Sequence, residues 1–171
     1  MSRLLRRWLA DHRGVAALEF ALVALPFLMV TFGTLEIGLL MFKTSIMEGA
    51  TRDAARQVRT GAAQTSANPL VDFQTAFCNG LFGMYDCATF YFDVRNFASF
   101  TAIALPAITF DANGIPNNVV FQPGGPGTVS TVRVLTNHVF ATPLIGSIMG
   151  SAGNNTLVVS STTVLKAEPY Q

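Results

Sequence analysis

The chain has 171 residues, of which 50% are hydrophobic and only 12% are charged, and its formal net charge is +1. This length suffices for one compact domain and one membrane helix, and the charged fraction is about half that of a typical globular domain. A net charge near zero, without a basic stripe beyond the first 14 residues, argues against an electrostatic nucleic-acid binder.

A basic leader occupies residues 1–14. It carries four arginines against the single acid Asp11 and ends at Gly14: Arg3, Arg6, Arg7 and Arg13. Because positively charged flanks of a membrane helix stay in the cytoplasm, these arginines place the rest of the chain outside the inner membrane.

An apolar segment of membrane length follows the leader. Residues 20–42 contain Glu36 as their only charge and would form a helix of roughly 34 Å, enough to cross a hydrocarbon core of about 30 Å. A cleaved secretory signal has an apolar run of only ~7–15 residues, and no small-x-small site follows here. We therefore expect a retained transmembrane helix.

The helix is expected to cover residues 15–60. Pro26 should kink it, because its ring removes a backbone donor and clashes with the preceding turn. Glu36 should reach the headgroup region on the far side. The helical period continues through residues 43–59, and Gly61 is a plausible stop.

Residues 61–69 indicate a linker, and residues 70–171 indicate a β-rich extracytoplasmic domain. A short helix is possible over 70–82. Extended segments are expected at 89–97, 108–110, 118–122, 128–135 and 156–165. The fold class is therefore α+β: a long N-terminal helix that leads into a small antiparallel sheet.

Two cysteines, Cys78 and Cys87, both follow the apolar helix. An even number of cysteines beyond a membrane helix fits a structural disulfide in an oxidising compartment. A metal or free-thiol role would need further ligands, which the sequence does not offer. We predict no metal site and no cofactor.

The N-terminal third resembles a known family. The sequence RGVAALEF at 13–20, Pro26, GTLEIG at 33–38 and residues 50–56 are similar to the TadE-like proteins. These are pseudopilins, or minor pilin-like subunits, of the tight-adherence (Tad/Flp) type IV pilus system. The resemblance covers about residues 13–59, and the closing KAEPY at 166–170 is similar to the Glu-Pro-aromatic ending of such proteins.

The resemblance implies a processing site. A prepilin peptidase would cut between Gly14 and Val15, so that Glu19 becomes the fifth mature residue and Phe20 the adjacent aromatic one. It also implies other pilin-like subunits and the inner-membrane assembly platform as partners, and a role in adhesion and biofilm formation. It implies no small-molecule substrate.

Glu19 has a physical role available in this scheme. The cut would create an amine at Val15, one helical turn away, with which Glu19 could pair in its own chain or in a neighbouring subunit. In the alternative interpretation, Glu19 pairs with no amine and its side chain only extends to the cytoplasmic headgroups.

Catalysis, a permanent membrane anchor and a surface adhesin are the alternative functions for this chain. The motifs of serine hydrolases, zinc proteases and phosphate-binding loops are missing from the sequence, so we expect no catalytic residues. An unprocessed single-pass anchor or adaptor of the secretion platform, and a surface adhesin subunit, remain as alternatives.

Overall fold

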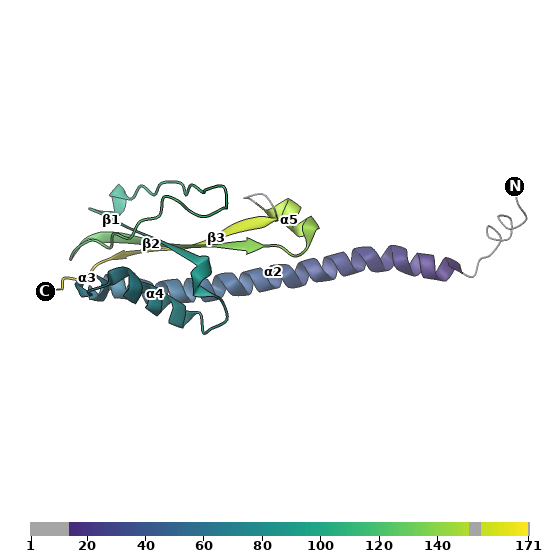
Figure 1. Ribbon diagram of the computed structural model, residues 1–171, viewed down its shortest axis with the longest axis horizontal. Coiled ribbons are helices and arrows are strands. Elements are labelled where there is room, and N and C mark those ends of the chain that lie inside the picture. Colours follow the sequence, from purple (N-terminus) through teal and green to yellow (C-terminus); the bar gives the residue numbers. More distant parts are fainter. Residues whose placement is uncertain (1–13, 151–154, 171) are drawn as a thin grey trace, which may run out of the picture.

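The computed structural model describes residues 14–150 and 155–170 (Figure 1). The leader arginines Arg3, Arg6, Arg7 and Arg13 therefore lie outside the described residues. The helices are α2 (Val15–Arg59), α3 (Ala62–Thr65), α4 (Pro69–Gly80) and α5 (Pro143–Met149), with short 3-10 turns η2 (Cys87–Thr89) and η3 (Phe100–Ala102). The strands are β1 (Phe90–Phe97), β2 (Val129–Val139) and β3 (Thr156–Lys166).

Helix α2 is one unbroken element that continues through Pro26. The expected kink at Pro26 stays a prediction. The helix stops where expected, since Gly61 takes a left-handed conformation with φ of +82°. A side chain there would be strained, and its Cβ would also collide with the ring of Tyr170.

The two halves of α2 have different surroundings. Its buried residues begin at Gly33, and most lie between Leu40 and Val58, where the helix packs against β2, β3 and α4. Its most apolar stretch has a mean hydropathy of 2.2, and none of that stretch is buried. The helix is long and apolar enough for a single-pass membrane anchor or a signal. In Figure 1 this N-terminal half projects beyond the rest of the molecule.

The sheet is antiparallel with the order β1-β2-β3. Alternate residues point toward the helices, and the register places Phe92 beside Val134 and Val134 beside Ser161. Since side chains alternate between the two faces of a strand, one face of each strand packs on α2 and α4. The expected α+β fold, with a long apolar helix and an antiparallel sheet, is confirmed.

Helix α4 fills the space between α2 and β1. Phe73 and Phe77 are fully buried, and the Phe77 ring lies edge-on to Phe90 and Phe92, at 5.1 Å between ring centres in each case. Gly80 permits a close crossing of α4 over α2, because a Cβ there would lie 2.8 Å from the Cα of Ala50.

Two of the expected strands do not form. Segments 108–110 and 118–122 make only isolated bridges, Phe110 with Pro116 and Val94 with Phe121. Their backbone groups are satisfied by a few backbone bonds and by side chains. Val94 donates to the carbonyl of Val120 and accepts the N–H of Gln122. Asn118 bonds to the backbone of Ala107 and Thr109, and Asp93 accepts the N–H of Val120. Pro116 also has no N–H to donate.

Candidate functional site

The junction at the start of α2 is open to its surroundings. Gly14 precedes the first helical residue, Val15, and every residue from 14 to 20 is exposed. A Cβ added to Gly14 would meet no atom within 4 Å. Nothing in the described part of the chain therefore covers the Gly14–Val15 bond.

Glu19 and Phe20 lie on the free half of α2, one turn beyond Val15. Among residues 14–150 and 155–170, Glu19 has no ion-pair partner and no hydrogen bond from a side chain. Its carboxylate stands just beyond the first turn of the helix, which itself carries no acidic residue. The geometry leaves this carboxylate free to pair with a charge from another chain.

The second acid of the apolar segment, Glu36, is held by the folded domain. Its carboxylate accepts the backbone N–H of Ala141 and that of Thr142, the latter at 3.1 Å from Oε2. These N–H groups belong to the turn between β2 and α5, over a hundred residues away in sequence. Glu36 thus attaches that turn to α2, and its carboxylate is compensated by these hydrogen bonds.

Two turns further along α2, Lys43 marks the polar boundary. Its Nζ donates to Thr136 Oγ1 and to the carbonyl of Asn137, both at 3.3 Å, and lies 5.7 Å from the ring centres of Tyr85 and Phe90. Burial lowers the pKa of this amine. The end of β2 is therefore fixed to α2 at this height.

His138 lies between these two charges. Its ring is edge-on to Phe140 at 4.9 Å, and within the described ranges its buried Nε2 has no hydrogen-bond partner. Burial lowers the pKa of the imidazole, Lys43 lowers it further, and Glu36 acts in the opposite direction. A neutral ring is therefore favoured here, which suits its position against Phe140.

We expect the Glu36→Ala variant to loosen the turn at residues 141–142, because two N–H groups lose a charged acceptor. Hydrogen bonds to charged groups contribute about 1.5–3 kcal/mol, so amide exchange at Ala141 and Thr142 should accelerate about ten- to a hundredfold. Hydrogen exchange of the full-length protein in lipid nanodiscs measures this effect. In the control, Glu48→Ala, only an exposed ion pair with Arg52 is lost, and exchange at the turn should not change. Equal exchange in wild type and Glu36→Ala would show that Glu36 does not hold the turn.

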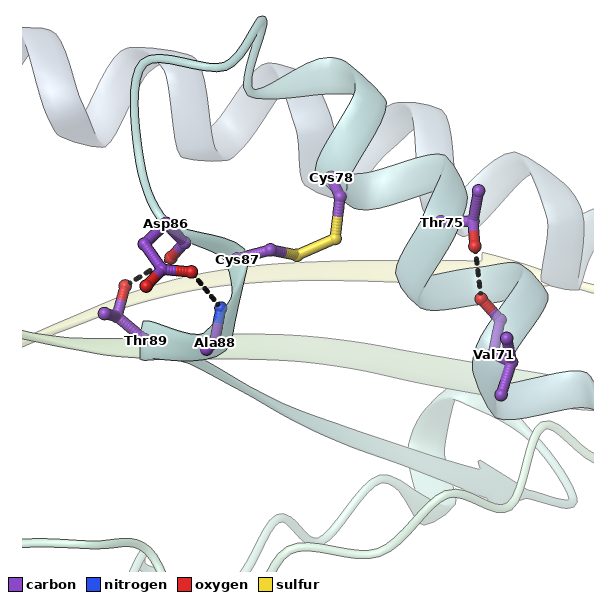
Figure 2. The surroundings of a disulfide bond; sticks show 7 residues. All are labelled: Val71, Thr75, Cys78, Asp86, Cys87, Ala88 and Thr89. Atoms are coloured by element: carbon purple, nitrogen blue, oxygen red, sulfur yellow. Dashed lines mark hydrogen bonds between the residues drawn. A yellow bond between two sulfur atoms is a disulfide. The ribbon is translucent and has the colours of Figure 1, made fainter.

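The predicted disulfide is present. Cys78, in the last turns of α4, is bonded to Cys87 at the start of η2, with 5.6 Å between their Cα atoms. Figure 2 shows the bond crossing from α4 to the segment that leads into β1, where Asp86 accepts the N–H of Ala88 at 2.9 Å. The bond therefore joins α4 directly to the edge of the sheet.

A buried cluster of one acid and two arginines lies on the opposite face of the sheet. The side chain of Asp93 is fully buried and bonds to Arg95 Nε at 3.0 Å and Arg133 Nη2 at 2.6 Å. The same arginines donate to the carbonyls of Asn118 and Pro106, in the long segment between β1 and β2. All these groups are paired, so the cluster pins the segment onto the sheet and leaves no free acid or base.

Sequence reasoning missed these long-range contacts. Asp93 and Arg95 stand two residues apart on a strand, which places them on one face, and this spacing was the available signal. No sequence pattern indicated α5 or its attachment to Glu36. In the described ranges, no group of three or more His, Cys, Asp or Glu residues could hold a metal ion.

The candidate junction residues thus lie together at the free end of a long apolar helix, far from the sheet. Residues 14–56 match the TadE-like protein family. The TadE-like segment begins at Gly14, contains Glu19, Phe20, Pro26 and Glu36, and ends near the close of α2. No curated protein and no solved structure significantly matches the chain.

The TadE-like segment covers almost all of α2 and none of the sheet. The disulfide, the Asp93 cluster and α5 all belong to the remainder of the chain. The family match therefore bears on the helix and its junction, while the domain packed on that helix is described by the structure alone.

Proposed function

We propose that this chain is a pseudopilin, or minor pilin-like subunit, that takes part in assembly of a Tad/Flp type IV pilus. The observation that carries the proposal is the TadE-like match at residues 14–56, on a helix whose apolar N-terminal half is unburied. TadE-like proteins are pilin-like and generally non-enzymatic structural proteins. Adhesion and biofilm formation would then depend on this subunit through the pilus.

The proposed topology follows from the charge pattern. Residues 1–14 form the cytoplasmic leader, residues 20–42 cross the inner membrane, residues 61–69 are the linker, and residues 70–171 form the extracytoplasmic domain. The disulfide between Cys78 and Cys87 supports this orientation, because such bonds persist in oxidising compartments. The proposed partners are a prepilin peptidase, other pilin-like subunits and the inner-membrane assembly platform.

Processing is the first test. Expressed with an active prepilin peptidase, the wild-type chain should yield a mature N-terminus at Val15, read by N-terminal sequencing and intact mass. The Gly14→Ala variant should retain its leader, because the peptidase loses the residue before the cut. Gly38→Ala, at another glycine of α2 with open space around it, should be processed normally. A chain that keeps Met1 beside an active peptidase would instead indicate an unprocessed anchor or adaptor.

Subunit pairing is the second test. We expect Glu19→Gln to insert and to be cleaved, but to co-purify with partner subunits much less than wild type, because a buried amine loses its counter-charge. Glu48→Gln removes a carboxylate from the domain half of α2 and should leave co-purification unchanged. Undiminished association of the Glu19→Gln chain would contradict the pairing role.

A further inference from the structure

Helix α5 lies beside the apolar half of α2. A Cβ placed on Gly33 would be 3.1 Å from Cδ1 of Ile145, and Glu36 accepts the N–H groups of the turn that precedes α5. In Figure 1, α5 lies at the end of the sheet that faces the free half of α2. The domain therefore reaches down to the level of residues 33–36.

Helix length places this level below the membrane surface. From Phe20 to Glu36 the axis advances about 24 Å, whereas the hydrocarbon core is about 30 Å thick. The first charge beyond Glu36 is Lys43, about 35 Å from Phe20. If the core begins near Phe20, α5 stands beside a part of α2 that is still within the outer leaflet.

The surface of α5 suits this depth. On α5, Leu144 is 51% exposed and Ile148 72%, and Val139 at the end of β2 is 65% exposed. The polar Ser147 is also exposed on α5, and its hydroxyl donates to the carbonyl of Leu144. The sequence has no Asp, Glu, Lys or Arg between Arg133 and Lys166. Between this region and α2 lies an open groove of about 620 Å³, with walls that include Phe32, Leu39 and Pro143. Only Glu36 is charged in its lining, and that carboxylate is bonded to backbone N–H groups.

We propose that α5 and the turn before it enter the outer leaflet of the membrane that α2 spans, as a second lipid-contacting element. This proposal rests on the proposed function, because it needs α2 to cross a bilayer. The occupant of the surface is lipid: the exposed apolar side chains of α5 are continuous with the unburied apolar face of α2, and a helix with such a face binds at the boundary between headgroups and acyl chains.

Tryptophan depth measurements test the proposal in the full-length chain. Trp8→Phe removes the native tryptophan, and single tryptophans are then introduced by Ile148→Trp, Phe27→Trp or Phe82→Trp. Phe27 reports on the exposed apolar half of α2, and Phe82, 79% exposed, reports on the loop that follows α4. Each protein is placed in vesicles of phosphatidylethanolamine and phosphatidylglycerol. Quenching by aqueous acrylamide is compared with quenching by lipids brominated near the carbonyl end of the acyl chain.

We expect Ile148→Trp to show a several-fold smaller acrylamide quenching constant than Phe82→Trp and strong quenching by the brominated lipid. If Ile148→Trp and Phe82→Trp have equal acrylamide quenching constants while Phe27→Trp is shielded by the bilayer, the proposal for α5 is wrong. Helix α2 would still span the membrane in that case. If Ile148→Trp is protected from both quenchers, a protein partner covers α5, which also overturns the proposal. If acrylamide also quenches Phe27→Trp strongly, residues 20–42 do not cross the bilayer, and the proposal for α5 is wrong as well.

Discussion

Replacing Asp93 by asparagine is expected to remove about 3–5 kcal/mol from the free energy of unfolding, because breaking a buried ion pair leaves its partners uncompensated. Two arginines, Arg95 and Arg133, would lose their shared carboxylate, and both are largely buried, with side chains 22% and 11% exposed. Total stabilities of such domains are about 5–15 kcal/mol, so the loss is a large fraction. The segment between β1 and β2 would also lose its attachment to the sheet.

Urea unfolding of the full-length protein in detergent micelles, followed by near-ultraviolet circular dichroism, measures this loss. The midpoint should fall by more than about 1 M, given slopes of about 1–3 kcal/mol per molar urea. Asp53→Asn, at an exposed carboxylate on α2, is the matched control and should change stability by less than about 0.5 kcal/mol. Equal midpoints for the two variants would mean that the cluster contributes little.

Truncating Phe77 to alanine should cost about 3–5 kcal/mol, the usual range for a buried phenylalanine. Its ring is fully buried and meets Phe90 and Phe92 edge-on. The cavity would open between α4 and β1, and the disulfide and the contact between the Phe73 and Phe92 rings would remain as links between them. We expect the native fold to survive with a lower urea midpoint.

The matched control for Phe77→Ala is Phe82→Ala, since Phe82 lies a few residues further on and is 79% exposed. It should unfold at nearly the wild-type urea concentration. A Phe77→Ala midpoint that stays within experimental error of the Phe82→Ala midpoint would contradict the packing of α4 described above.

The elements that sequence predicts well are those with local signals. Helix α2 has a long apolar run, a sustained helical period and a glycine at its end, so both its extent and its stop at Gly61 could be predicted. The disulfide follows from two cysteines beyond a membrane-length helix. The three strands that form each contain a run of alternating or β-branched residues, and each run is long enough to pair with a neighbouring strand.

The elements that sequence does not predict depend on distant partners. Segment 118–122 has the composition of a strand, but its backbone bonds to Asp93 and Arg95, which no local pattern reveals. Helix α5 has only seven residues, too few for a clear period. In the sequence, Glu36 is an isolated and costly charge in an apolar run. Its partners, the N–H groups of Ala141 and Thr142, are more than a hundred residues away and reach it only in the folded chain.

The continuity of α2 has a mechanical consequence. The residues that would sit in lipid and the residues that form the domain core belong to one helix, with no flexible joint between them. An axial pull on the free end would therefore displace the sheet by the same distance, and the contacts of α5 would have to move with it. Helix α2 therefore transmits an axial force to the sheet directly, because no loop interrupts it between Val15 and Arg59.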